Sequence, residues 1–237
     1  MIEKGIFATI KKNAPLLSVG VLSANLMHLE SELSLLEHLS IKMLHFDVMD
    51  GCFVPYLTVG PRFINAVKTH LIKDVHLMIQ RPENTIEQYI DAGADMLTIH
   101  LESTHSAESL LKKLGELENV NNPQKGIIRG VALNPDTPLM LLEPLLENIE
   151  MVTVLAVDLK REGFPFFKSI GDRFIEVKKM IAEREKEIIL CIDGGVKREN
   201  IGELAQLGPD ILVSGSAVFK DGKVSENINA MLQELKH

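Results

Sequence analysis

The chain is poor in cysteine and lacks any long hydrophobic run. Its two cysteines, Cys52 and Cys191, are separated by more than half of the 237 residues. Such sparse thiols fit the reducing cytosol better than a disulfide-stabilised secreted domain. No apolar run approaches the ~20 residues of a transmembrane helix, and residues 1–15 contain no uninterrupted apolar core typical of a signal peptide. We therefore expect a soluble cytoplasmic protein with no membrane partner.

An excess of basic residues is also absent. The 33 acidic residues outnumber the 25 lysines and arginines, so the formal net charge is −8 at pH 7. No basic stripe compensates this charge, which argues against nucleic acid as a partner. With 46% hydrophobic and 24% charged residues, the composition is typical of a globular protein.

Short apolar segments alternate with helical patterns from residue 16 to the end. The strand candidates span residues 16–22, 43–49, 74–79, 96–102, 126–133, 151–157, 188–193 and 211–218. Apolar residues recur at three- and four-residue spacing in segments 25–39, 82–93, 138–149 and 173–186. Eight strands each followed by a helix predict a single (β/α)8 TIM barrel over residues 16–237, with residues 1–15 as an N-terminal extension.

The alternative fold is a doubly wound open sheet, which uses the same alternation of strands and helices. The sequence has no G-x-G-x-x-G motif after its first strand, and eight repeats are many for an open sheet. The length is also close to the ~250 residues of a typical barrel. These features favour the barrel.

Polar side chains occur near the ends of three predicted strands. His45 and Asp47 lie in the second strand, His76 in the third, and Asp193 ends the seventh. The carboxyl ends of barrel strands carry the chemistry, so these groups are expected to converge. Two imidazoles and two carboxylates suit one divalent ion, such as zinc, manganese, cobalt or iron(II).

Each of these residues also has a structural explanation. A histidine on a strand is often an ordinary core residue, and an aspartate before Gly-Gly can simply form a turn. A metal site nevertheless accounts for all four residues at once. His100 and Glu102, near the end of the fourth strand, share a face and either line the site or have ordinary core or rim roles.

Glycine-bearing turns follow the seventh and eighth strands. They contain Gly194 and Gly195, and then Gly215 with Ser216. Loops at these positions of a barrel often bind phosphate through backbone N–H groups, although glycine can also merely tighten a turn. A Schiff-base mechanism lacks support, because Lys73 and Lys125 lie at strand starts, the opposite end.

Several segments together resemble the ribulose-phosphate 3-epimerase family. They read "LHFDVMDGCFVPYLTVGP", "DVHLMIQRPE", "AGADMLTIHLE", "GVALNPDTPL", "CIDGGV" and "VSGSAVF", in the order of that family. The resemblance implies a (β/α)8 barrel of the ribulose-phosphate-binding type that interconverts ribulose 5-phosphate and xylulose 5-phosphate in the pentose phosphate pathway. A related branch inverts carbon 3 of allulose 6-phosphate.

The resemblance also implies roles for individual residues. His45, Asp47, His76 and Asp193 would hold one divalent metal ion, and Asp47 and Asp193 would also be the acid–base pair that moves the carbon-3 proton through an enediolate. Met49 and Met78 match methionines that pack beside this intermediate. The implied partners are a small sugar phosphate and further copies of the chain in a homo-oligomer.

The sequence departs from the family pattern where phosphate is usually bound. The family's glycine-rich loop is replaced by "VDLKREGFPFFKS" at residues 157–169, which keeps only Gly163. Lys160 and Arg161 either supply charge to the phosphate or belong to a solvated turn. Gly20 stands where the family has a serine. Three functions therefore stay open: the ribulose 5-phosphate epimerase, a 3-epimerase of another ketose phosphate, and a sugar-phosphate-binding barrel with little turnover.

Overall fold

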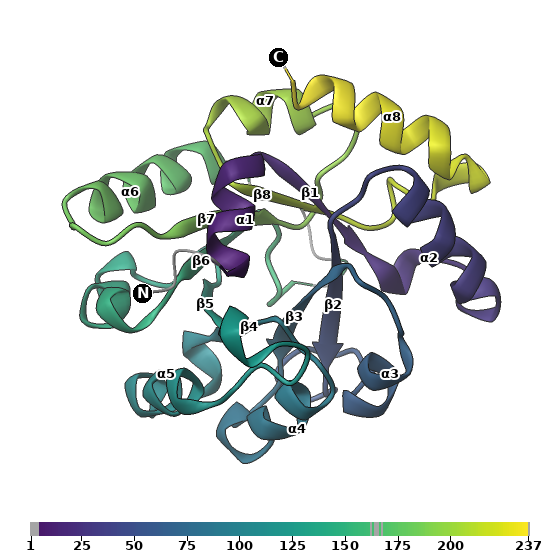
Figure 1. Ribbon diagram of the computed structural model, residues 1–237. Coiled ribbons are helices and arrows are strands. Elements are labelled where there is room, and N and C mark those ends of the chain that lie inside the picture. The colour runs from purple at the N-terminus through teal and green to yellow at the C-terminus, as the bar shows by residue number, and fades with distance from the viewer. Residues whose placement is uncertain (1–4, 162, 164–165, 167, 237) are drawn as a thin grey trace.

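Eight parallel strands close into a barrel in which each strand pairs with its neighbours in sequence and β1 pairs with β8 (Figure 1). The computed structural model describes residues 5–161, 163, 166 and 168–236. The strands are β1 (Leu16–Gly20), β2 (Met43–Met49), β3 (Ile72–Met78), β4 (Met96–His100), β5 (Ile128–Leu133), β6 (Met151–Leu155), β7 (Ile189–Asp193) and β8 (Ile211–Ser214). The predicted TIM barrel is confirmed.

Helices cover the outside of the barrel, and the first α-helix covers one of its ends. The α-helices are α1 (Ile6–Asn13), α2 (Leu29–His38), α3 (Pro61–Ala66), α4 (Ile86–Asp91), α5 (Ala107–Glu116), α6 (Ile170–Ala182), α7 (Ile201–Gln206) and α8 (Val224–Glu234). The 3-10 helices are η1 (Val21–Ser23), η2 (Leu26–His28), η3 (Pro82–Asn84), η4 (Leu101–Ser103), η5 (Pro123–Lys125), η6 (Leu139–Asn148) and η7 (Lys220–Gly222). Within the described residues, none of the helices has the length and apolar character needed to cross a membrane.

The fifth connection differs in type from its sequence pattern. Segment 138–149 has the apolar spacing of an α-helix, but η6 is a 3-10 helix with Pro144 inside it. Proline lacks the N–H that an α-helical hydrogen bond requires, and its ring clashes with the preceding turn. The buried side chains Leu142, Leu145 and Leu146 still pack this segment against the barrel.

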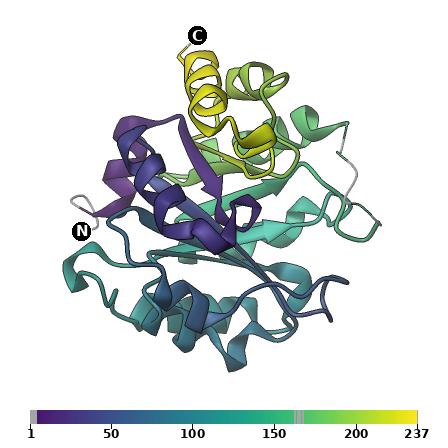
Figure 2. The same cartoon turned by 90° about the vertical axis from the view of Figure 1, so that its right-hand side faces the viewer.

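The segment predicted as an N-terminal extension contains α1. Its buried Ile6 and Ile10 join the apolar side chains inside one end of the barrel, among them Met43 and Met96. Figure 2 shows the barrel from the side, with α1 at the end near the N-terminus. This helix therefore closes the floor of the barrel; residues 1–4 lie outside the described part of the chain.

The strand register places the polar side chains together above this floor. Asp47 is paired with His76 between β2 and β3, and His45 with Asp74. Asp193 ends β7 beside Leu155 of β6. Because alternate residues of a strand point to the same face, these side chains share the barrel interior.

Candidate metal centre

His45, Asp47, His76 and Asp193 lie together at the carboxyl end of the barrel. One ligand atom from each of these residues lies within 4.8 Å of those from all the others. β2 supplies the first two, β3 the third and β7 the last. The convergence expected from the strand ends is therefore present.

Each imidazole directs one nitrogen toward both carboxylates. Nε2 of His45 lies 3.2 Å from Oδ1 of Asp47 and 3.5 Å from Oδ2 of Asp193. Nδ1 of His76 lies 3.1 Å from the same oxygen of Asp193 and 3.5 Å from that of Asp47. Two nitrogens and two oxygens thus face one small space.

The two carboxylates favour positive charge on the neighbouring imidazoles. Burial lowers the pKa of His76, but the carboxylates of Asp193 and Asp47 outweigh it and raise that pKa to about 9. Burial likewise opposes charge on His45, whose pKa is raised well above 6.5 by Asp74, Asp193 and Asp47. Burial raises the pKa values of Asp47 and Asp193, yet the two histidines bring both below the usual range. Without a metal, protons on the imidazoles supply the charge that the carboxylates require.

These residues fit a divalent metal ion. Nδ1 of His76 is buried and has no hydrogen-bond partner among the described residues, although it faces two carboxylates. Imidazole nitrogen and carboxylate oxygen are ligands that zinc, manganese, cobalt and iron(II) accept. A buried nitrogen that faces two carboxylate oxygens without a hydrogen bond to either is the arrangement that a bound cation would satisfy.

Each histidine also contacts a polar group through the ring nitrogen that faces away from Asp47 and Asp193. Nδ1 of His45 bonds Oδ2 of Asp74 at 2.7 Å. Nε2 of His76 lies 2.9 Å from Nε2 of His100, whose Nδ1 lies 3.2 Å from Oε2 of Glu102. The sequence reasoning did not single out Asp74. Its position two residues before His76, on the same face of β3, was the available signal.

A cavity of about 500 Å³ opens above the cluster. It is lined by most of the predicted site residues: Asp47, Met49, His76, Met78, Gly163, Asp193, Gly194, Gly195, Gly215 and Ser216. His45 lies behind this surface, with its side chain 3% exposed. The two methionines join Leu155 in an apolar cluster at the same place. The cavity therefore combines a polar floor with one apolar wall.

The glycine turns bring backbone to the cavity surface. Gly194 and Gly195 adopt φ values of +97° and +64°, which favour glycine. A Cβ on Gly195 would lie 2.7 Å from the ring of Phe166, and one on Gly20 would lie 3.0 Å from Cα of Gly215. Side chains at these positions would narrow the cavity or push the turns apart.

Lys160 and Arg161 do not line this cavity. The exposed ammonium of Lys160 pairs with Asp136 at 2.8 Å, and Arg161 pairs with Asp158 at 3.0 Å. Lys197, which sequence reasoning did not select, does line it, as does Asn200. Residues 162, 164, 165 and 167 of the altered segment lie outside the described part of the chain.

Comparison with known proteins gives consistent matches across the chain. Residues 16–219 match the model of the ribulose-phosphate 3 epimerase family. The chain is 35% identical over 202 residues to the ribulose-phosphate 3-epimerase of Bacillus subtilis, covering 84% of this chain and 89% of that protein. It is 31% identical over 223 residues to the Escherichia coli K12 protein of the same name, covering 93% and 96%.

Solved structures of other barrels share the fold at low sequence identity. One is 3-keto-L-gulonate-6-phosphate decarboxylase from Vibrio cholerae, with a TM-score of 0.69, 13% identity and coverage of 94% of this chain and 98% of that one. Another is 3-hexulose-6-phosphate synthase from Salmonella typhimurium, with a TM-score of 0.63, 18% identity and coverage of 93% and 98%. At such identities these structures support the fold alone.

Proposed function

Because the chain belongs to the ribulose-phosphate 3-epimerase family, we propose that it is a metal-dependent enzyme that inverts carbon 3 of ribulose 5-phosphate to give xylulose 5-phosphate. Relatives carrying the epimerase name match over most of the chain, so the protein is an isomerase acting on carbohydrates. The observation that carries the proposal is that Asp47 and Asp193 both line the cavity while both face the two histidines.

Inversion at carbon 3 requires removal of a proton from one face and delivery of a proton to the other. One carboxylate accepts the carbon-3 proton, which leaves an enediolate across carbons 2 and 3. The other residue, in its carboxylic acid form, donates a proton to the opposite face. After one turnover the two protonation states are exchanged, and solvent resets them.

His45, Asp47, His76 and Asp193 would hold the divalent ion. When bound, it supplies positive charge next to the sugar oxygens, which stabilises the enediolate. Asp74 orients His45, while Met49 and Met78 keep water away from the reacting carbon. The particular ion is proposed to be zinc, manganese, cobalt or iron(II).

The phosphate is proposed to bind at the turns after β7 and β8. Gly194, Gly195, Gly215 and Ser216 line the cavity, and their backbone N–H groups would bind the phosphate oxygens. Lys197 is the single lysine or arginine among the described residues that line the cavity, so we assign it the charge partner of the phosphate. A phosphate role for Lys160, Arg161 and Gly163 stays a second prediction.

The remaining proposals concern the setting of the enzyme. The partner is a small sugar phosphate, the assembly is a homo-oligomer, and the location is the cytoplasm. Both cysteines are free, and the net charge of −8 disfavours nucleic acid. Light scattering on the purified protein measures the assembly directly.

The decisive experiment is proton exchange at carbon 3. Protein loaded with a divalent metal is incubated with ribulose 5-phosphate in deuterated water, and NMR follows the carbon-3 signal and xylulose 5-phosphate. We expect deuterium at carbon 3 together with product. Allulose 6-phosphate is run in parallel, because activity on it alone would favour a 3-epimerase of another ketose phosphate. Inactivity on both, in protein shown to contain metal, would favour a barrel that only binds sugar phosphates.

A further inference from the structure

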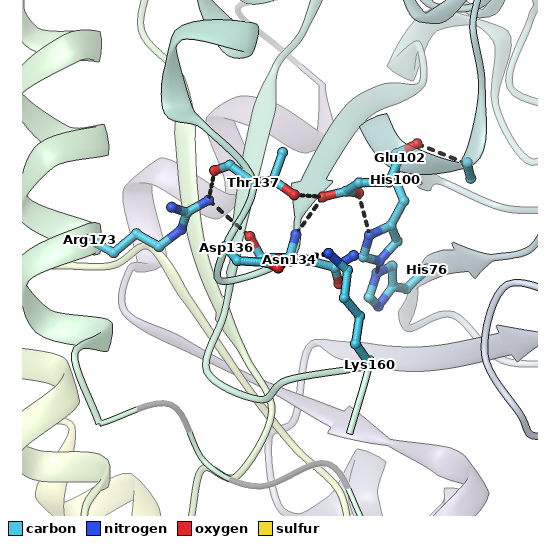
Figure 3. A network of polar contacts seen from close by, with 9 residues as sticks. His76, His100, Glu102, Asn134, Asp136, Thr137, Lys160 and Arg173 are labelled. Atoms are coloured by element: carbon cyan, nitrogen blue, oxygen red, sulfur yellow. Dashed lines mark hydrogen bonds and ion pairs between the residues drawn. The ribbon is translucent and has the colours of Figure 1, made fainter. Parts of the chain in front are cut away.

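A chain of hydrogen bonds runs from His76 away from the cavity. Figure 3 shows it passing through His100 to Glu102 and on to the turn that carries Thr137. The side chains of His76 and His100 are 1% and 0% exposed. Water therefore cannot replace the contact between the two rings, and the position of each proton matters.

The direction of proton donation along these hydrogen bonds follows from their far end, at Glu102. Oε1 of Glu102 accepts the backbone N–H of Asn134 at 2.8 Å and the hydroxyl proton of Thr137. An ionised carboxylate only accepts, so its Oε2 must accept Nδ1–H of His100. A neutral imidazole with its proton on Nδ1 has a lone pair on Nε2. Nε2 of His100 therefore accepts, and Nε2–H of His76 donates.

This direction fixes the free nitrogen of His76. A histidine that binds a metal is neutral, and with its proton on Nε2 the neutral ring of His76 has its lone pair on Nδ1, which faces Asp47 and Asp193. The opposite direction would place a proton on Nδ1, where it would block a metal. Glu102 thus acts on the metal ligand without touching the metal site.

The turn that holds Glu102 is itself anchored. Nη2 of Arg173, in α6, donates to the carbonyl oxygens of Asn134 and Thr137 at 3.0 and 2.6 Å (Figure 3). The donors around Oε1 are therefore fixed in place, which leaves Oε2 for His100 alone among its described partners.

We propose that His100 and Glu102 are positioning residues that set the tautomer of His76 and so raise the affinity of the site for its metal ion. The inference rests on the metal site proposed above. A single residue in direct contact, Asp74, orients His45 in the same way. A carboxylate thus orients each of these histidines. Asp74 contacts His45 directly, whereas Glu102 acts on His76 through the imidazole of His100.

Glu102→Gln tests the inference because the amide reverses the chain. Its oxygen must face the N–H of Asn134, so its NH₂ group faces Nδ1 of His100 and donates. The proton of His100 then moves to Nε2 and points at His76. We expect the affinity for Zn²⁺, measured by competition with a chelator, to fall roughly 10–100-fold.

Glu150→Gln is the matched control. Glu150 is also a buried carboxylate, 4% exposed, and binds Arg129 at the opposite end of the barrel. Its loss lowers stability without reaching His76, so Zn²⁺ affinity should stay at the wild-type value. An equal loss of affinity in both variants would overturn the inference, because the cause would then be general destabilisation.

Two changes at His100 test the acceptor itself. His100→Gln can offer an amide oxygen to Nε2–H of His76 and should retain most of the Zn²⁺ affinity. His100→Phe offers no acceptor and should lose as much as Glu102→Gln. Equal affinities in the glutamine and phenylalanine variants would contradict the proposed role.

Nitrogen-15 NMR of the histidine rings reads the tautomer independently of metal and activity. We expect His100 to carry its proton on Nδ1 in the wild type and on Nε2 in Glu102→Gln. A wild-type His100 protonated on Nε2 would overturn the inference. Wild-type protein that binds no Zn²⁺ would overturn the metal site and the inference together, whereas tight and equal binding by wild type and Glu102→Gln would overturn the inference alone.

Discussion

At the scale of single residues, the two roles proposed for Asp193, metal ligand and acid–base group, depend on two features of its surroundings. Its carboxylate faces the imidazoles of His45 and His76, which lower its pKa despite burial. It also lines the cavity, so it can reach a substrate. The positive charge of the imidazoles keeps the Asp193 carboxylate ionised, and an ionised carboxylate can both bind a metal ion and accept a proton.

Asp193→Asn is expected to lower epimerase turnover about 10²–10⁴-fold, the range typical of a lost acid–base group. The amide keeps the shape of the side chain but cannot accept the carbon-3 proton. Turnover is measured with ribulose 5-phosphate, and circular dichroism checks the fold. Wild-type turnover in the folded variant would exclude the two-aspartate scheme.

At the scale of elements, the turns after the strands carry the residues proposed to bind the phosphate of the substrate. The turn after β7 carries Lys197 to the cavity, whereas the segment after β6 pairs Lys160 with Asp136 on the outside. Both side chains of the Lys160–Asp136 pair are exposed, so this ion pair contributes little to stability. The two segments therefore offer a direct comparison of candidate phosphate partners.

Lys197→Ala is expected to raise the KM for the phosphorylated substrate about tenfold, the effect of ~1.4 kcal/mol of lost binding. The Lys160→Ala, Arg161→Ala double variant should raise it less, because neither side chain lines the cavity. Steady-state kinetics on both variants make the comparison. A larger effect of the double variant would assign the phosphate to the segment after β6.

The floor helix α1 makes an element-scale contribution to stability. Ile10 is fully buried against the apolar end of the barrel. Ile10→Ala should lower the free energy of unfolding by about 2–4 kcal/mol, through lost burial and the cavity left behind. Exposed Lys12→Ala is the control and should change it little. Equal denaturant midpoints for the two variants would contradict the role of α1 as a closing element.

At the scale of the whole molecule, the four residues of the candidate metal centre link stability to pH. The barrel holds two aspartates and two histidines close together, with His76 buried. The pKa of His76 in the folded protein is about 9, above the usual 6.5, so folding favours the protonated form of this histidine. That stabilisation is complete below pH 6.5 and is lost as the pH rises through 9.

Metal-free protein should therefore lose on the order of 3 kcal/mol of stability between pH 6.5 and 9.5 from His76. Saturating divalent metal should reduce this loss, because the ion replaces the protons as the source of positive charge. Urea unfolding across this range measures both. Constant stability of the metal-free protein would contradict the raised pKa.

The sequence by itself determined the order of the elements and the residues that converge. Period-two spacing on β2 and β3 identified His45, Asp47 and His76, and the apolar run before Asp193 marked the end of β7. The β2 bounds of 43–49 agree with the prediction, whereas the fourth predicted strand ends two residues early, at His100, because η4 begins at Leu101. Local spacing is enough for these predictions because a strand dictates which side chains share a face.

Only the tertiary structure decided the partners of these residues. Glu102 meets Thr137, 35 positions later, and Lys160 meets Asp136, 24 positions earlier. The 3-10 form of η6 and the closing role of α1 likewise depend on packing against the barrel. Contacts between distant segments depend on closure of the barrel and on the path of each connection, so local side-chain periodicity cannot specify them.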